Sequence, residues 1–388
     1  MVHKGDFIMN SQPCIIMITC HPLDDARIVK HCNFLKTTYA NARFLKIKWQ
    51  KSEIIANTSQ DYSILDLSTY NKFYKRIKLF FEAFFNGKIM TLLREISKDQ
   101  TIILHIHDPE LIPVTSALKW KFSNLKIVYD KHEYHFFSFR STTSIERWFY
   151  ESIFRRWIDS IVVVTKEMSD ETKKTTRQNM PIEIIPNYPS INLFPQKNIV
   201  DKIKNIDNFE MRFVYFGSLL NINRDVSCIF SCSEKILQSF PRAIILIGGR
   251  GISKEDLIIA KRLESSYPTS FFYLGEVSYN FVISETSKAH FGFLALKARS
   301  EEMKKYTTIS NNKIFEYLIS GTIPLLSMQN IDIDIPSKYY ISLTDNFIKK
   351  IEEMQLNKRL RMEMRNYACS RSWENVSTKY KYIYNLIA

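Results

Sequence analysis

The sequence predicts an α/β protein of two domains, each built around a parallel β-sheet that helices cover on both faces. The chain has 388 residues, which is enough for two separate hydrophobic cores. Short runs rich in Val, Ile and Leu alternate with longer amphipathic stretches, a pattern typical of buried parallel strands joined by helices. The alternation breaks off at a polar segment near residue 200 and then starts again, so we expect one such unit on each side.

The first unit accounts for the N-terminal half of the chain. Its strand candidates are the apolar runs at 15–19, 42–46, 102–106, 126–130 and 160–164. The stretches with helical spacing lie between them, at 25–37, 70–97, 111–122 and 144–157. The near-continuous Ile and Val content of the strands predicts burial on both faces, which a sheet with helices on both sides provides.

The second unit repeats the pattern in the C-terminal half. Its strand candidates lie at 212–216, 243–247, 270–273, 291–296 and 323–326, and charged helical stretches follow at 346–364 and 373–386. We therefore divide the chain into an N-terminal domain at 1–190, a linker at 191–210, a C-terminal domain at 211–370 and a last helix at 371–388. Ligands of such sheets bind beyond the carboxyl ends of the strands.

The composition excludes a disordered chain, because 45% of the residues are hydrophobic and 13% are aromatic. The six cysteines are scattered, as in proteins of a reducing compartment. Cys228 and Cys232 lie four residues apart without further ligands nearby, so we expect no metal site. The apolar run at 14–20 is too short and too late for a signal peptide, and no run approaches the length of a membrane span. We expect a cytoplasmic protein.

The net charge of +14 favours an anionic partner: nucleic acid, anionic lipid or an anionic substrate. The chain has no recognition-helix, RNP or zinc-finger signature, so we do not expect nucleic acid. Lysines and arginines alternate with phenylalanines across residues 70–98, as in basic amphipathic helices that bind an anionic membrane surface. The alternative is a pair of scaffold helices with solvated charged faces. The first interpretation predicts peripheral binding to the inner face of the cytoplasmic membrane.

The segment 312–324 is the most informative stretch of the second unit. Asn312 is a good N-cap, and Gly321 stands where a helix ends, because glycine takes a positive φ at little cost. Lys313 and Glu316 lie in the first turn, beside the free amides that suit a phosphate. A carboxylate next to such a site can accept from ribose hydroxyls, which indicates a nucleotide site. The alternative is an ordinary amphipathic helix whose dipole favours a first-turn Glu.

Polar residues follow two strand candidates of the first unit. His107 and Asp108 come directly after the strand at 102–106; His107 could orient an acceptor hydroxyl or remove its proton. Asp108 is expected to cap the next helix, with Pro109 at the first helical position. Asp130, His132 and Glu133 follow the next strand, where they could bind sugar hydroxyls or form a solvated loop. After the first strand, His21 can face the ligand, and Arg27 can anchor the fold.

Glycines follow the first two strands of the second unit. Gly217 and the pair Gly248 and Gly249 let the backbone approach a ligand closely, and Arg224 offers a guanidinium for a phosphate. The glycine spacing matches neither the dinucleotide-binding fingerprint nor the P-loop.

Taken in order, these segments resemble the retaining GT-B glycosyltransferases of the group called family 4, in the branch that makes bacterial surface polysaccharides. The resemblance covers nearly the whole chain. It is carried by His21-Pro with Asp25 and Arg27, His107-Asp-Pro-Glu-Leu-Ile-Pro113, Tyr129-Asp-Lys-His-Glu133, Pro186-Asn-Tyr-Pro189, Tyr215-Phe-Gly217 with Arg224, Gly248-Gly249, Asn312-Lys-Ile-Phe-Glu-Tyr317 with Gly321 and Pro324, and Trp373-Glu374.

The resemblance implies two Rossmann-like domains whose parallel sheets face an interdomain cleft, the first for the acceptor and the second for the nucleotide sugar, with the last helix packing back across both. Arg224 and Lys313 would hold the diphosphate in place of a metal ion, Glu316 the ribose, and His107 the transferred sugar. No cofactor is expected. Further contacts with the substrates are implied for His21, Asp108, Asp130, His132, Glu133, Asn187, Gly217, Gly248, Gly275, Val277, Thr308, Asn311 and Asn312.

The implied activity is a hexosyl transfer with retention, from a nucleotide-diphosphate sugar to a saccharide or polyprenol-linked acceptor, in surface polysaccharide or lipopolysaccharide biosynthesis. Two positions depart from the family pattern: Thr308 stands where many relatives have a second Glu, and Asp225 where many have Gly. The alternatives are a GT-B-fold epimerase of nucleotide sugars and a non-catalytic subunit of a polysaccharide assembly complex.

Overall fold

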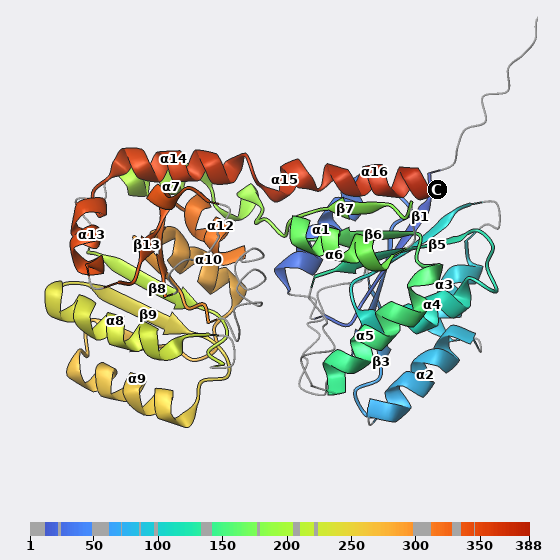
Figure 1. Ribbon diagram of the computed structural model, residues 1–388, viewed down its shortest axis with the longest axis horizontal. Coiled ribbons are helices and arrows are strands. Elements are labelled where there is room, and N and C mark those ends of the chain that lie inside the picture. The colour runs from blue at the N-terminus through green and yellow to red at the C-terminus, as the bar shows by residue number, and fades with distance from the viewer. Residues whose placement is uncertain are drawn as a thin grey trace, which may run out of the picture. The chain divides into compact units, whose positions relative to one another are not determined.

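The computed structural model describes residues 12–21, 25–48, 62–70, 72–84, 87–96, 100–132, 142–176, 179–204, 210–220, 224–297, 312–327, 335–344 and 346–388. The chain forms two compact units (Figure 1). Unit 1 contains Met1–Pro186 together with Ser377–Ala388, and unit 2 contains Asn187–Val376. The chain therefore returns to its first unit with its last twelve residues, within the stretch predicted as a separate final helix.

Unit 1 is built on a parallel sheet of seven strands in the order β3-β2-β1-β4-β5-β6-β7. The strands are β1 (Cys14–Thr19), β2 (Arg43–Lys48), β3 (Tyr62–Asp66), β4 (Ile102–Ile106), β5 (Leu125–Lys131), β6 (Ser160–Val163) and β7 (Ile182–Ile184). Its helices are α1 (Ala26–Thr38), α2 (Lys72–Phe84), α3 (Lys88–Arg94), α4 (Ile112–Leu118), α5 (Thr142–Phe154), α6 (Lys166–Thr175) and α16 (Thr378–Ile387), with short 3-10 turns η1 (Pro109–Leu111) and η3 (Arg155–Trp157).

Unit 2 is built on a second parallel sheet, of six strands in the order β10-β9-β8-β11-β12-β13. The strands are β8 (Arg212–Phe216), β9 (Ile244–Gly248), β10 (Phe271–Tyr273), β11 (Phe291–Leu294), β12 (Ile323–Leu326) and β13 (Ile341–Ser342). The helices are α7 (Gln196–Lys204), α8 (Val226–Ser239), α9 (Lys254–Ser266), α10 (Tyr279–Lys288), α12 (Asn312–Ile319), α13 (Phe347–Met354), α14 (Lys358–Cys369) and α15 (Trp373–Val376), with turns η4 (Ile191–Leu193) and η6 (Ser337–Tyr339).

The predicted fold class is confirmed, because each unit has a parallel sheet whose central strands are buried on both faces. Every residue of β1, β4 and β6 is buried, and so is every residue of β11 and β12. Each sheet lies within its own hydrophobic core. In the described part of the chain, none of the helices combines the length and the apolar character that a membrane span needs.

Several predicted boundaries are wrong. The helix expected at 346–364 is interrupted between α13 and α14, where the Asn357 side chain caps α14. The helical stretch at 70–97, interpreted as a pair of helices, contains α2 and α3. Instead of a linker, the segment 191–210 carries α7, whose Ile199 and Ile203 are buried in unit 2. Asn312 is the first residue of α12 rather than its cap.

The C-terminal end of α12 is held by arginine side chains from α14. Gly321 ends this helix with φ = 67°, as predicted from its place in the sequence. Arg361 is fully buried and donates from Nη1 to the carbonyl oxygens of Gly321 (2.7 Å) and His290 (2.9 Å), and from Nη2 to that of Gln355 (3.0 Å). Arg365 donates to the carbonyl of Ile319. The bonds to Ile319 and Gly321 occupy carbonyls at the end of α12 that the helix itself leaves without a donor.

Candidate active site

The glycines at the strand ends of unit 2 bring three backbone segments together. Gly217 N–H, after β8, donates to the Gly248 carbonyl (3.0 Å), and Gly249 N–H, after β9, donates to the Gly275 carbonyl (2.7 Å). Gly249 has φ = 156°, and a Cβ there would lie 1.6 Å from the Gly217 carbonyl oxygen. The backbone at Gly249 can therefore come this close to Gly217 only because Gly249 has no side chain.

Lys313 reaches the same place from the start of α12. A Cβ on Gly217 would lie 2.8 Å from Lys313 Cε and 3.1 Å from its Nζ, so the glycine leaves the room that the lysine side chain occupies. Val277 lies beside Gly248, at 3.3 Å from the position that a Cβ would take there. The strand ends and the first turn of α12 thus form one site.

The charges of this site interact with one another. Burial lowers the pKa of the Lys313 ammonium, the Glu316 carboxylate acts to raise it, and the Arg224 guanidinium lowers it further. Burial also raises the pKa of Tyr215 to about 12, although Arg224 opposes this shift by its charge and a hydrogen bond. Arg224, which lies far from Lys313 and Glu316 in the sequence, therefore shares one environment with them and with Tyr215.

Glu316 is buried and accepts a hydrogen bond from the hydroxyl of Tyr279 (3.3 Å). Tyr279 and Tyr215 are site residues that the sequence analysis missed, because nothing in their local sequence distinguishes them from core tyrosines. Asn187 is the first residue of unit 2 and is partly exposed. Glu133, Thr308 and Asn311 lie outside the described residues.

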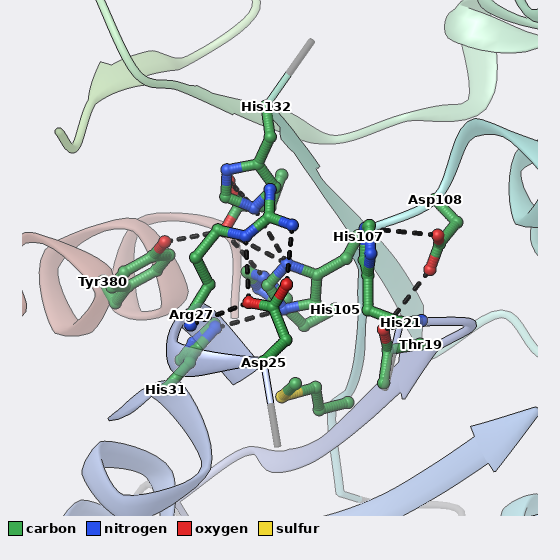
Figure 2. Close-up of polar contacts among 12 residues, drawn as sticks. Thr19, His21, Asp25, Arg27, His31, His105, His107, Asp108, His132 and Tyr380 are labelled. Carbon is green, nitrogen blue, oxygen red and sulfur yellow. Dashed lines mark hydrogen bonds and ion pairs between the residues drawn. The ribbon is translucent and has the colours of Figure 1, made fainter. Parts of the chain in front are cut away.

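In unit 1, the polar residues at the ends of β4 and β5 form a buried cluster (Figure 2). His105 Nε2 lies 3.3 Å from Asp130 Oδ2, and His107 Nδ1 lies 3.0 Å from His132 Nε2. Asp130 is fully buried, so the solvated-loop alternative is wrong for this residue. The side chain of His107 is 1% exposed and that of His132 is 11% exposed, so His132 covers His107.

Three residues from distant helices complete this cluster, and the sequence analysis predicted none of them. His31 of α1 contacts His107, with 3.3 Å between Nδ1 and Nε2. Tyr380 of α16 donates to Asp130 Oδ2 (2.6 Å). The hydroxyl of Tyr384 lies 2.8 Å from His105 Nδ1 and 3.1 Å from His31 Nε2.

Burial shifts the titration of the imidazoles toward the neutral form, whereas the neighbouring histidines favour the ionised form of the carboxylate. It lowers the pKa of His31 and His107 well below the usual value, and that of His132 to about 4. Burial also acts to raise the pKa of Asp130, but the surrounding histidines His132, His105 and His107 hold it well below its usual value.

Asp108 does not cap the turn that follows it, contrary to the prediction. In the described structure its side chain makes no capping bond to η1, although Pro109 does begin that turn. Asp108 Oδ2 instead accepts from the backbone N–H of Cys20 (2.7 Å), and Oδ1 lies 3.4 Å from His21 Nε2. Burial raises the pKa of Asp108, while His21 acts to lower it. The carboxylate thus ties the end of β4 to the end of β1.

Arg27 lies at the start of α1 and pairs with the residue that caps this helix. Its Nε and Nη2 donate to the two carboxylate oxygens of Asp25, at 3.0 and 2.9 Å. Asp25 also accepts from the Arg27 backbone N–H, as an N-cap does. Burial acts to raise the pKa of Asp25, yet the contacts with Arg27 lower it to about 2.

Solved structures of other proteins share this fold. No family model matches the chain, and a search of curated proteins finds no relative. A sucrose-phosphate synthase from Thermosynechococcus elongatus superposes with a TM-score of 0.70 at 13% identity, over 97% of this chain and 98% of that one. A glycosyltransferase from Rickettsia africae gives 0.64 at 12% identity, over 97% and 98%.

The HepE protein of Anabaena, solved with UDP and glucose, gives a TM-score of 0.63 at 10% identity, over 95% of this chain and 99% of that one. Identities this low carry information about the fold and not about the reaction. The two parallel sheets, of seven and six strands, superpose on these structures over nearly the whole chain. The chain therefore has the two-domain α/β fold known as GT-B.

Proposed function

We propose that the protein is a glycosyltransferase that moves a sugar from a nucleotide-diphosphate sugar to a saccharide or lipid-linked acceptor. The observation that carries this proposal is the shared environment of Arg224, Lys313 and Glu316 beside the glycine turns of unit 2. Two cations beside the glycine turns and the first turn of α12 suit a diphosphate. HepE, which has the same fold, has been solved with UDP-glucose.

The donor's diphosphate would lie against Lys313 and Arg224, which neutralise the charge that develops as the bond to the sugar breaks. In this role they replace a metal ion at the diphosphate. Burial lowers the pKa of Lys313. A diphosphate beside this side chain would act in the opposite direction, because a neighbouring anion favours the charged ammonium. Glu316 would accept from the ribose hydroxyls, with Tyr279 fixing the carboxylate through its hydroxyl.

The acceptor side would lie at the strand ends of unit 1. His132 is the more exposed ring of the histidine pair, and His107 stacks parallel to it with an interplanar angle of 3°. We therefore assign the substrate contact to His132 and the support of that ring to His107. Retention of the anomeric configuration, a hexosyl donor and a role in surface polysaccharide or lipopolysaccharide synthesis belong to the same proposal, supported by the family-4-like motifs.

Nucleoside diphosphate binding tests this proposal. UDP and GDP are titrated into the wild type, Arg224→Ala and Lys313→Ala, and the melting temperature is recorded. Because a hydrogen bond to a charged group contributes about 1.5–3 kcal/mol, each variant should bind the effective nucleotide about 10- to 100-fold more weakly and show a smaller shift. Lys288→Ala, which removes an exposed lysine of the same unit, should shift like the wild type. Equal shifts in all four proteins would contradict the assigned diphosphate site.

A second part of the proposal concerns the acceptor, which we expect to be lipid-linked and therefore at a membrane surface. Helices α2 and α5 lie side by side, joined by the ion pair of Arg76 and Glu146 (Figure 1). Together they expose large apolar side chains: Tyr74, Ile77, Phe80, Phe81, Ile145, Trp148, Phe149 and Ile153. Helix α2 also carries Lys75, Arg76 and Lys78, and basic residues on a helix with exposed apolar side chains are typical of proteins that lie on anionic membranes.

Sedimentation with liposomes tests the membrane interaction. The protein should pellet with vesicles that contain phosphatidylglycerol and less with neutral vesicles, and added salt should release it. Changing Phe81 and Trp148 to serine should abolish pelleting, because both side chains belong to the exposed apolar surface. Ile258→Ser removes a side chain that is 70% exposed in unit 2 and should have no effect. Absence of binding at low salt would remove this part of the proposal.

A further inference from the structure

Four buried side chains of unit 1 offer ligand atoms for one metal ion. They are His31 of α1, His105 at the end of β4, His107 just after it, and Asp130 of β5 (Figure 2). One ring nitrogen or carboxylate oxygen from each lies within 4.8 Å of the others. Imidazole and carboxylate are ligands that first-row transition metals accept in proteins.

The separations within the cluster suit ligands of one small ion. His31 Nδ1 lies 3.3 Å from His107 Nε2, and His105 Nε2 lies 3.3 Å from Asp130 Oδ2. Two ligands at about 2.0–2.1 Å from Zn²⁺ in tetrahedral geometry are about 3.4 Å apart, so these pairs already have the spacing of coordinated atoms. The four residues come from three different elements, so their spacing in the sequence gives no metal-binding motif.

One oxygen of the Asp130 carboxylate has no hydrogen bond. In the described structure Oδ1 is buried and lies 3.3 Å from His132 Nε2, a contact that is an ion pair only when that ring is protonated. A buried carboxylate oxygen without a donor is costly unless a cation lies nearby. This observation is independent of the distances above, and it indicates that the cluster is completed by a positive ion.

A second layer of contacts holds each proposed ligand. The Tyr384 hydroxyl lies 3.1 Å from His31 Nε2 and 2.8 Å from His105 Nδ1, the ring nitrogens that would not bind the metal. The corresponding nitrogen of His107, Nδ1, lies 3.0 Å from His132 Nε2. Tyr380 donates to the carboxylate of Asp130. Histidines that bind metals use their second nitrogen in this way, which fixes the tautomer and the orientation of the ring. Both tyrosines belong to α16, the last helix of the chain.

We propose that His31, His105, His107 and Asp130 bind a divalent transition-metal ion, with Zn²⁺ as the ion that three imidazoles and one carboxylate favour. Protein atoms fill all four positions of a tetrahedral site, which is the arrangement of structural and not catalytic zinc. The ion stabilises unit 1 by linking α1 to β4 and β5, and it orients the tyrosines that attach α16 to the sheet. It is separate from the donor diphosphate, whose proposed ligands belong to unit 2.

Metal content and spectroscopy test the site on the full chain. The protein is stripped with a chelator and reloaded with Zn²⁺ or Co²⁺, and bound metal is measured by mass spectrometry after desalting. We expect one equivalent, a higher melting temperature and, with Co²⁺, the intense visible absorption of a tetrahedral complex. The variants His31→Gln and Asp130→Asn should retain no bound metal ion, and Tyr384→Phe should bind the metal about 10- to 100-fold more weakly. His21→Gln, a histidine of the same unit outside the cluster, should keep it.

Two results would overturn the proposal. One is a folded wild type that retains no Zn²⁺ or Co²⁺ after desalting. The other is unchanged metal content in His31→Gln and Asp130→Asn. If these variants fail to fold, Co²⁺ absorption by the wild type decides, because a spectrum typical of octahedral Co²⁺ in solution excludes a tetrahedral site. The nucleotide titration uses residues of unit 2, so either proposal can fail without the other.

Discussion

Replacing Gly249 with alanine is expected to leave little folded protein. A Cβ at this position would lie 1.6 Å from the Gly217 carbonyl oxygen, and the contacting atom belongs to backbone that cannot rotate away. Relief requires separating the turns after β8 and β9, which breaks the bond from Gly217 N–H to the Gly248 carbonyl. Overpacking alone costs about 1–3 kcal/mol, so with the lost bond and strained backbone we expect a loss of about 3 kcal/mol or more.

Gly275→Ala is the matched control for this change. Gly275 also has a positive φ, of 62°, but no atom lies within 4 Å of the Cβ that the substitution would add. Its cost is therefore only that of a left-handed backbone, about 1–2 kcal/mol. Urea denaturation of both variants measures the difference. Equal, small losses would show that the turns do not approach each other as described.

Arg361→Met is expected to destabilise unit 2 by about 3–5 kcal/mol. The substitution keeps a long aliphatic side chain but removes the donors to the carbonyls of Gly321 and Gln355. The His290 carbonyl loses one of two bonds, because the backbone N–H of Ile323 also donates to it. Each buried acceptor left without a donor costs about 1–3 kcal/mol. The carbonyl of Gly321 closes α12, the helix that carries Lys313 and Glu316, so nucleotide binding should weaken together with stability.

Arg359→Met on the same helix is the control. Its side chain is 91% exposed and pairs only at the surface with Glu363, so the change should stay within about 0.5 kcal/mol of the wild type. Thermal and urea unfolding of the two variants give the comparison. A similar, small effect of both substitutions would mean that the buried guanidinium does not hold α12.

The strands at the centres of the two sheets could be predicted because burial on both faces requires continuous apolar runs. The bounds of β4, β8 and β12 agree with the predicted ranges. The strands β3, β7 and β13 were missed. All three lie at the edges of the sheets. β7 has three residues, all of intermediate burial, and β13 has only two residues. Partial burial weakens the periodic signal of an edge strand without removing it, since β10 is also an edge strand of three residues and was predicted at 270–273.

The site was predictable to the extent that it depends on strand ends and helix starts. His107, Asp130 and His132 follow predicted strands, and Lys313 and Glu316 begin a predicted helix, so local sequence placed them. His31, Tyr380 and Tyr384 lie within helices and resemble ordinary core residues. Their proximity to Asp130 results from how α1 and α16 pack on the sheet, which no short segment of sequence specifies.

The structure of the protein with a bound nucleoside diphosphate tests the central claim most directly. The account predicts diphosphate oxygens within hydrogen-bond distance, about 3 Å, of both the Arg224 guanidinium and Lys313 Nζ, with the ribose hydroxyls on Glu316. A nucleotide that is bound elsewhere, with the two cationic side chains directed into solvent, would contradict it.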